Sequence, residues 1–398
     1  MCSSDLSWVI GEASTGSAAT PGATKGQSTS SVAINSTFVF MVTITAPRMR
    51  FVVVQLALER ASGIHTAWQL AARRLLGHAL ETHPDAVVYS RALPFASIDA
   101  VADVRRERTF RWIVNVNDPL PADVWPGLYR VDEWTARQTD KAMQRALPMI
   151  DAFTFPCAQL RSLEVERFPD ISRVPSRLLP HIGERVTARQ KARRADRQGP
   201  LRIAFSGTLR RNRARQEFTA GLHEFARTEP LAAAGIELSF HLRRPNAFGQ
   251  ELIGGVPFRS RLAIGESDEE VERALLEADL LLDLESEPDR PLLLTKVANG
   301  VGLRKPIWAI CEPNGTTWNL VKEHEWGYAT ALGDRELVTG SLREIWADWK
   351  TGSMAARGPN PDLVERFSAA RQVIDLAELC AEVLEPGRAT SRPVCDWP

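Results

Sequence analysis

Hydrophobic positions along the chain form short apolar runs that alternate with longer stretches of helical spacing. In the first half, strand-length apolar runs cover residues 51–54, 86–90, 110–116 and 152–155. Helical patterns separate these runs at residues 61–80, 94–107 and 131–147. Short apolar strands that alternate with helices indicate a parallel sheet, because each crossover helix returns the chain to the same end of the sheet.

The second half of the chain repeats this alternation. Strand patterns begin at Leu201 and cover residues 235–241, 279–283 and 306–311. Helical patterns cover residues 213–227, 268–277, 294–303, 336–349 and 361–384. The chain is therefore predicted to be an α/β protein with two Rossmann-like, doubly wound domains. Because such sheets bind ligands outside the carboxyl ends of their strands, we expect the site in an interdomain cleft.

Changes in composition mark the borders of these domains. Residues 1–47 are rich in Ser, Thr, Gly and Ala, and are predicted to be disordered or extraneous to the fold. Residues 48–182 form the first domain, residues 201–352 the second, and residues 353–398 a C-terminal helix and tail. Residues 183–200 lie in a basic stretch and are interpreted as a solvated linker. Contact of this linker with acidic lipid headgroups is the alternative interpretation.

Charge and cysteine content narrow the functional classes. Lys+Arg and Asp+Glu both number 49, so the net charge gives no reason to expect a nucleic-acid partner. The five cysteines include no C-x-x-C pair, which argues against a disulfide framework or zinc site and favours a cytosolic protein. No apolar run reaches the roughly 18 residues of a membrane span. No Asp-x-Asp follows a strand, and we expect neither a catalytic metal nor a cofactor.

The segment from Leu201 to Leu209 ends an apolar strand with Ser-Gly-Thr, directly before a basic run. A glycine at this point lets the backbone approach a phosphate, and free N–H groups at the start of the next helix point toward it. We therefore interpret Gly207, Thr208 and Arg213 as a diphosphate cradle, with Lys296 as a second phosphate or sugar contact. An ordinary turn beside an exposed helix arginine is the alternative.

The order of motifs between Asp85 and Ala331 resembles a GT-B glycosyltransferase of the family-four type (glycosyl transferases group 1). The element that grips the donor diphosphate in that family is similar to Ser206-Gly207-Thr208-Leu209-x-x-x-Arg213. A second donor motif of the family is similar to the segment from Thr295 to Ile307. The resemblance implies a retaining enzyme that moves a sugar from a nucleotide-diphosphate sugar to a glycan, lipid-linked or small-molecule acceptor.

Three positions depart from the pattern of this family, and one of them is Arg304, where the family has glycine. The family carries two glutamates eight positions apart, and this chain has Asn299 and Pro291 there. Asn299 can still hydrogen-bond ribose hydroxyls as a donor-binding residue. Glu285 is one of the carboxylates just upstream that could substitute for a missing glutamate.

Two residues of the first domain are candidates for catalysis. Asp118 follows the strand at residues 110–116, where acceptor-side chemistry is expected, and is a candidate base or acceptor-orienting carboxylate. The alternative for Asp118 is turn formation, since Asn-Asp-Pro is a strong turn signal. His65 is the second candidate, and a structural histidine is its alternative. Among the tryptophans, Trp308 is expected in the core, whereas Trp318 and Trp326 flank the predicted donor loop and could stack on a ligand.

We therefore expect a cytosolic glycosyltransferase of polysaccharide biosynthesis that binds its nucleotide sugar mainly on the second domain. Two alternatives stay open. One is a non-catalytic GT-B nucleotide-sugar-binding or scaffold protein of a polysaccharide pathway, which the departures at Asn299 and Pro291 favour. The other is a Rossmann-type oxidoreductase, which is disfavoured because neither half has G-x-G-x-x-G after its first strand.

Overall fold

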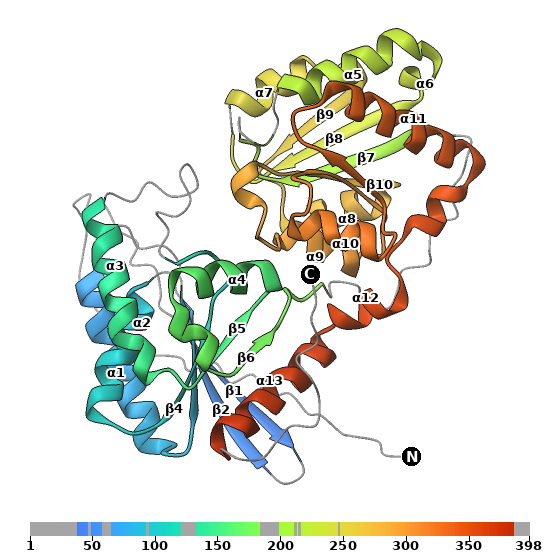
Figure 1. Cartoon of the computed structure of the whole chain (residues 1–398). Helices are drawn as coiled ribbons and strands as arrows, with labels where there is room; N and C mark the ends of the chain where they lie inside the picture. Colours follow the sequence, from blue (N-terminus) through green and yellow to red (C-terminus); the bar gives the residue numbers. More distant parts are fainter. Residues whose placement is uncertain are drawn as a thin grey trace, which may run out of the picture. The chain divides into compact units, whose positions relative to one another are not determined.

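The structure is a computed structural model, and it describes most of the chain outside the N-terminal segment and the basic linker. The described residues are 38–46, 49–57, 65–92, 95–120, 133–183, 199–210, 213, 216–245 and 247–385. They fall into two compact units: the first comprises the described residues up to 155, together with 164–177 and 377–385, and the second comprises residues 156–163 and the described residues between 178 and 376. Each unit is built on one six-stranded sheet (Figure 1).

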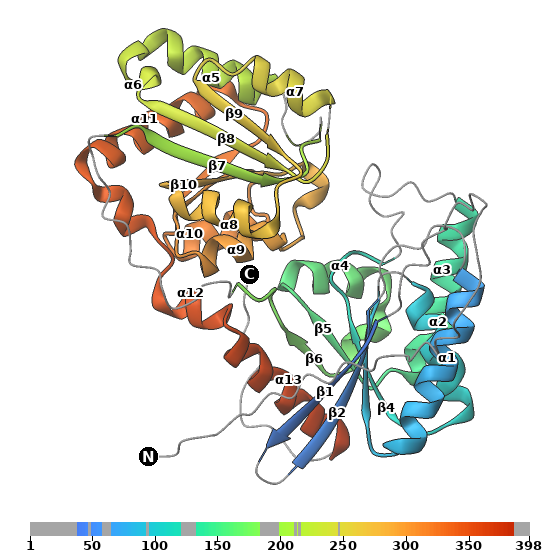
Figure 2. The same ribbon diagram turned by 180° about the vertical axis from the view of Figure 1, so that it is seen from behind.

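The strands of the first sheet lie side by side in chain order. They are β1 (Phe38–Ala46), β2 (Met49–Ala57), β3 (Val87–Arg91), β4 (Arg111–Asn115), β5 (Ala152–Phe155) and β6 (Ser176–Leu178). Strands β2 to β5 are parallel, and β1 is antiparallel to β2. The connecting helices α1 (His65–Thr82), α2 (Ala96–Glu107) and α3 (Glu133–Ala146) cover one face of the sheet (Figures 1 and 2). When all crossovers between parallel strands have the same handedness and each leads to the next strand in the same direction, the connecting helices all lie on one face of the sheet.

Strand β1 corrects part of the sequence-based domain division. Residues 38–46 were expected to lie outside the fold, yet they pair with β2 along their whole length, from Phe38 opposite Ala57 to Ala46 opposite Met49. The composition of residues 1–47 as a whole masked this apolar, β-branched stretch of nine residues. Residues 1–37 and most of the predicted linker, residues 184–198, lie outside the described residues.

The second sheet has the strand order β12-β11-β10-β7-β8-β9, and its strands are all parallel. These strands are β7 (Leu201–Gly207), β8 (Ile236–Leu242), β9 (Arg259–Ile264), β10 (Leu280–Leu284), β11 (Ile307–Cys311) and β12 (Tyr328–Ala331). The chain winds outward from β7 to β9, then returns to the other side of β7 and winds outward again. This is the doubly wound Rossmann order, and its switch point lies between β7 and β10.

Helices cover both faces of the second sheet. In both views α5 (Gln216–Thr228) and α11 (Arg335–Thr351) lie on one face, whereas α8 (Asp268–Glu277), α9 (Thr295–Gly302) and α10 (Thr316–Glu323) lie on the other (Figures 1 and 2). The remaining helices are α4 (Ala158–Arg167), α6 (Pro230–Ala234), α7 (Ala247–Gly254), α12 (Pro361–Arg366) and α13 (Ala369–Leu384). The single helix predicted over residues 361–384 is thus two helices. No helix among the described residues has the length and apolar composition that a membrane span requires.

Aromatic side chains fill the core of the second unit. Phe205 on β7 packs against Phe240 on β8 with ring centroids 5.8 Å apart, and Phe218 on α5 packs against Trp308 on β11. The core position expected for Trp308 is confirmed, because it is fully buried. A stacking role for Trp326 is wrong: its ring is also fully buried, and its Nε1 donates to the carbonyl oxygen of Lys305 at 2.8 Å.

Candidate functional site

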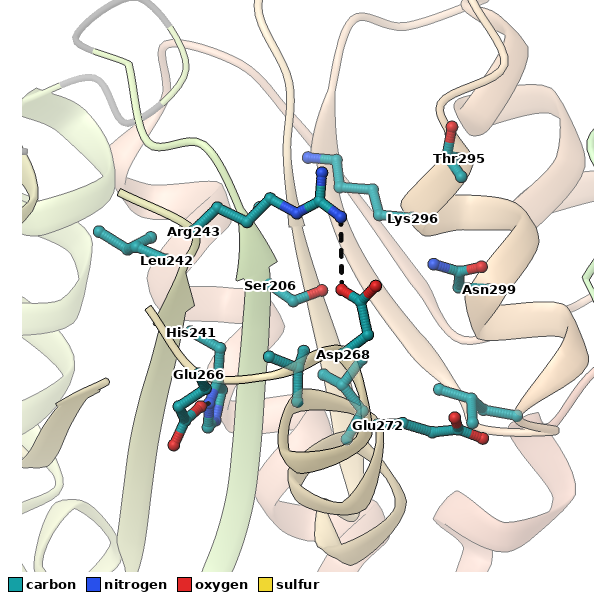
Figure 3. A pocket seen from close by; sticks show the side chains of 14 residues that line it. Ser206, His241, Leu242, Arg243, Glu266, Asp268, Glu272, Thr295, Lys296 and Asn299 are labelled. Carbon is teal, nitrogen blue, oxygen red and sulfur yellow. Dashed lines mark hydrogen bonds and ion pairs between the residues drawn. The ribbon is translucent and has the colours of Figure 1, made fainter. Parts of the chain in front are cut away.

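A cavity of about 350 Å³ lies at the carboxyl end of β7 in the second unit (Figure 3). Four elements meet around it: the end of β7, the end of β8, the start of α8 and the start of α9. The polar residues that line it include Ser206, Gly207, Arg243, Asp268, Lys296 and Asn299. The cavity therefore lies beside the switch point of the sheet, where Rossmann-like domains bind their ligands.

Gly207 ends β7 with a backbone conformation that favours glycine. Its φ is +132°, which residues with a side chain rarely adopt. A Cβ on Gly207 would meet only the Phe205 ring, at 3.9 Å, so the backbone conformation rather than crowding calls for glycine here. Without a side chain, the backbone at this strand end is accessible from the cavity that Gly207 lines.

Lys296 lies on the first turn of α9 and forms the cationic wall of the cavity. Its ammonium group donates to the carbonyl oxygen of Leu284 at 2.8 Å and makes a close ion pair with Asp283. The Phe205 ring lies beneath it, 5.3 Å from Nζ to the centroid. Asp283 is the one charged residue on the otherwise apolar strand β10, and it is only 1% exposed. Lys296 thus neutralises a buried carboxylate at the edge of the cavity.

Two further carboxylates lie just beyond β10. Glu285 is almost fully buried, and Thr317 Oγ1 donates to its Oε1 at 2.6 Å. Burial and the nearby charge of Asp283 hold the pKa of Glu285 well above its ordinary value. Asp289 is also buried, which by itself would raise its pKa. Hydrogen bonds from Arg213 and Ser286 outweigh this effect and hold the pKa of Asp289 below the usual range.

Arg213 is bound to Asp289 and does not lie against the cavity. Its Nε and Nη2 donate to the two Asp289 carboxylate oxygens at 2.8 and 2.6 Å. The Arg213 side chain is 12% exposed, and that of Asp289 is fully buried. The expectation that Arg213 lies against a diphosphate is therefore not supported by its position. A partner 76 residues away in the chain could not be read from the local motif.

The structure brings together three of the donor-site residues predicted from sequence. Gly207, Lys296 and Asn299 line the same cavity. Within the described part of the chain, Thr208, Arg213 and Glu285 are not among the lining residues; Thr208 lies just past β7 and is exposed. Asn299 thus lies at the cavity, whereas Glu285, one of the predicted substitutes for a missing glutamate, is buried and does not line it.

The two catalytic candidates belong to the first unit. Asp118 is half-buried in the turn that follows β4. That turn is anchored by Glu164, whose Oε1 accepts from the backbone N–H of Leu120 at 2.6 Å. Burial raises the pKa of Glu164 to about 8. His65 is the first residue of α1, and its side chain lies outside what the structure describes.

Arg243 is a cavity residue that the sequence analysis did not identify. It follows β8, and Figure 3 shows its side chain extending over the cavity to Asp268 at the start of α8. The Nη2–Oδ1 distance is 3.3 Å, and both side chains are more than two-thirds exposed, so the pair is weak. Its place just beyond a strand end was the available signal, since the carboxyl ends of parallel strands meet at one edge.

A buried histidine forms the cavity wall next to Arg243. His241 Nδ1 lies 2.5 Å from Glu266 Oε2, and its Nε2 lies 3.2 Å from Ser239 Oγ. Both ring nitrogens are therefore engaged by neighbouring side chains. No group of three or more His, Cys, Asp or Glu side chains in the described ranges is arranged to hold a metal ion.

Comparison with solved structures shows that this chain has the GT-B fold, the two-domain, Rossmann-like α/β architecture of many glycosyltransferases. No protein-family model matches the sequence, and no curated protein matches it. A glycosyltransferase from Rickettsia africae superposes with a TM-score of 0.57 at 11% identity, over 83% of this chain and 85% of that one. A UDP-forming trehalose-phosphate synthase from Burkholderia xenovorans, in complex with glucose-6-phosphate, gives 0.57 at 11% identity, over 82% and 80%. An E. coli structure described as trehalose-6-phosphate, bound with UDP-2-fluoro glucose, gives 0.55 at 12% identity, over 85% and 89%.

Proposed function

We propose that this protein is a glycosyltransferase that takes a sugar from a nucleotide-diphosphate sugar held in the cavity of the second unit. The observation that carries the proposal is that Gly207, Lys296 and Arg243 line one cavity beside the switch point of a Rossmann-like sheet. Two similar structures add support, since one is described as bound with UDP-2-fluoro glucose and the other as UDP-forming.

Two cationic residues of the cavity suit the charge that develops on a departing diphosphate, although Glu266, Asp268 and Glu272 also line it. Lys296 and Arg243 supply cationic donors from opposite walls, and the backbone at Gly207 allows close approach. Helix α9 begins at Thr295 without a side-chain N-cap, and a helix N-terminus stabilises an anion. Asn299, one turn into α9, is placed to hydrogen-bond ribose hydroxyls. In this proposal the chain itself stabilises the leaving group, and no metal is required.

The finer features of the reaction belong to the same proposal. Retention of configuration and a glycan or lipid-linked acceptor follow from the motif resemblance. A cytosolic location, a role in polysaccharide synthesis, and peripheral membrane contact through residues 183–200 are parts of the proposal that rest on sequence alone. Asp118 remains the proposed acceptor-side carboxylate, with His65 as a second candidate.

A non-catalytic nucleotide-sugar-binding protein is the second candidate function. It is favoured by the exchange of the two family glutamates for Asn299 and Pro291. The structure adds a reason, because Glu285 is buried and bonded to Thr317 and so does not supply the missing carboxylate to the cavity. Release of nucleoside diphosphate from a bound nucleotide sugar, followed over time, separates the two: turnover identifies an enzyme, and binding without turnover identifies a scaffold.

Thermal unfolding of the full chain in the presence of a panel of nucleotide sugars tests the proposal. A ligand at 100 times its Kd stabilises the folded state by about 2.7 kcal/mol, which raises the melting temperature by several degrees. The double variant Lys296→Met with Asp283→Asn removes the cation without leaving a buried carboxylate unpaired, and it should lose most of this shift. Lys322→Met, on α10 over the Trp318 ring, is the matched control. The proposal fails if no nucleotide sugar shifts the wild type, or if the double variant shifts as much.

A further inference from the structure

A network of polar side chains runs along the carboxyl edge of the first sheet. Thr154, at the end of β5, is fully buried, and its Oγ1 lies 2.9 Å from the Tyr89 hydroxyl on β3. Asn115, at the end of β4, is 7% exposed and donates through Nδ2 to the same Thr154 oxygen at 2.9 Å. These side chains come from three neighbouring strands and are bonded to one another, so each fixes the orientation of the next.

The network ends on the guanidinium of Arg91. Asn117 lies two residues beyond β4, and its amide is assigned in the orientation that gives both its nitrogen and its oxygen a suitable partner. In that orientation the nitrogen donates to Asn115 Oδ1 at 3.2 Å, and the oxygen accepts from Arg91 Nη2 and Nε at 2.6 and 3.0 Å. Arg91 is the last residue of β3, it is exposed, and it stands opposite Asn115 in the strand register.

Arg91 differs from other arginines of this unit in its partner. Arg105 and Arg111 both pair with Asp151, and Arg73 pairs with Asp103. Among the described residues, no carboxylate lies within ion-pair distance of Arg91, and a neutral amide holds it instead. Within the described part of the chain its positive charge therefore has no ion-pair partner, and two of its N–H groups hold the plane of the guanidinium against the Asn117 amide.

An oriented guanidinium with free donors suits one class of ligand. Its planar fork matches the geometry of a phosphate or carboxylate, which it binds through two parallel hydrogen bonds. Parallel α/β sheets bind their ligands at the carboxyl ends of the strands. A network that fixes a side chain before the ligand arrives also reduces the conformational entropy lost on binding. We propose that Arg91 binds an oxyanion, a phosphate or a carboxylate, carried by the acceptor substrate. That the bound molecule is the acceptor rests on the proposed function, whereas the anion site itself does not.

Titration calorimetry of the full chain tests this site with defined probes. The probes are inorganic phosphate, a hexose 6-phosphate, a hexuronate and the neutral hexose. The wild type should bind the hexose 6-phosphate or the hexuronate more tightly than the neutral sugar, and whichever binds tighter identifies the oxyanion. Arg91→Gln should weaken that binding by roughly ten- to a hundredfold, the usual effect of losing charged hydrogen bonds. Arg74→Gln, which removes the same charge from an exposed position on α1, should leave it unchanged.

A second variant keeps the arginine and neutralises its charge. Asn117→Asp places a carboxylate where the amide oxygen now accepts from Arg91, and should abolish anion binding in a folded protein. Nucleotide sugars are proposed to bind to the second unit, so they should stabilise all these variants to the same extent. The inference is overturned if no anionic probe binds the wild type, or if Arg91→Gln or Asn117→Asp binds as well as Arg74→Gln. If anions bind through Arg91 but no nucleotide sugar stabilises the chain, the proposed function fails and the anion site stands.

Discussion

The pair formed by Arg213 and Asp289 provides a sharp prediction, because the motif interpretation and the structure give it different roles. If Arg213 were a diphosphate ligand, Arg213→Gln would weaken donor binding and leave the fold intact. In the structure Asp289 is fully buried and Arg213 is only 12% exposed, and the two are joined by two hydrogen bonds of 2.6 and 2.8 Å. We therefore expect Arg213→Gln to reduce stability and to leave donor binding unchanged.

The size of this effect follows from the burial of the pair. Removing one partner of a buried ion pair costs about 3–5 kcal/mol, since the remaining charge is left uncompensated. Asp289 keeps its hydrogen bonds from Ser286, so we expect the lower end, about 3 kcal/mol. For a unit of this size each kcal/mol lowers the melting temperature by about 2–4 °C, which gives a loss of about 6–12 °C at neutral pH.

The pH dependence of this loss gives an internal check. Arg213 holds the pKa of Asp289 below its usual value, so the pair contributes stability above the unfolded-state pKa of about 4. That contribution disappears as the pH falls through the lowered pKa of the folded state. The difference in melting temperature between the wild type and Arg213→Gln should therefore shrink below about pH 4.

Differential scanning calorimetry of the full chain measures this difference, and Arg213→Gln combined with Asp289→Asn is the control. The double variant leaves no buried charge and should recover part of the lost stability. The reasoning is refuted if Arg213→Gln melts within about 2 °C of the wild type at pH 7 and also loses its stabilisation by nucleotide sugars.

Three further predictions concern the cavity, the first unit and the second sheet. Arg243→Gln should weaken nucleotide-sugar binding about tenfold by calorimetry. It should change the melting temperature by less than about 1 °C, because the ion pair of Arg243 with Asp268 is exposed. Burial raises the pKa of Glu164 to about 8, so its ionisation is disfavoured in the folded state. Wild-type stability should therefore fall as the pH rises from about 4.5 to about 8. Glu164→Gln still accepts the hydrogen bond from the Leu120 N–H and should flatten this dependence of the melting temperature on pH. Gly327→Ala should destabilise the chain by more than about 3 kcal/mol in urea, because φ is +78° and a Cβ would overlap the backbone of the neighbouring strand, whereas Gly340→Ala, with open space within α11, should be neutral or stabilising.

The central strands of both sheets could be predicted because they are continuous apolar runs. The sequence FVVV predicted β2, and IWAIC predicted most of β11. Strand β9 was missed because it lies at the edge of its sheet and carries Arg259 and Arg261 in exposed positions, which breaks the apolar pattern. Strand β12 was missed because four residues are too few to show a period.

The site was predictable only as far as local motifs reach. Gly207 and Lys296 were found because a strand-end glycine and a lysine at a helix start have recognisable sequence contexts. The roles of Arg213 and Arg243 depend on which side chains the fold brings near them. Arg213 meets a carboxylate that is distant in sequence, and Arg243 reaches the cavity from a strand whose neighbours are set by topology. Pairing between residues distant in the chain cannot be inferred from motif spacing, although the position of Arg243 just beyond a strand end was a signal that it could line the cavity.

Hydrogen–deuterium exchange of the full chain, with and without the nucleoside diphosphate that stabilises it most, tests the central claim most directly. If the cavity at the end of β7 holds the diphosphate, added ligand should slow exchange in peptides covering residues 204–210 and 294–300, with little change over α11. Protection confined to the first unit, or to the opposite end of β7, would contradict the account.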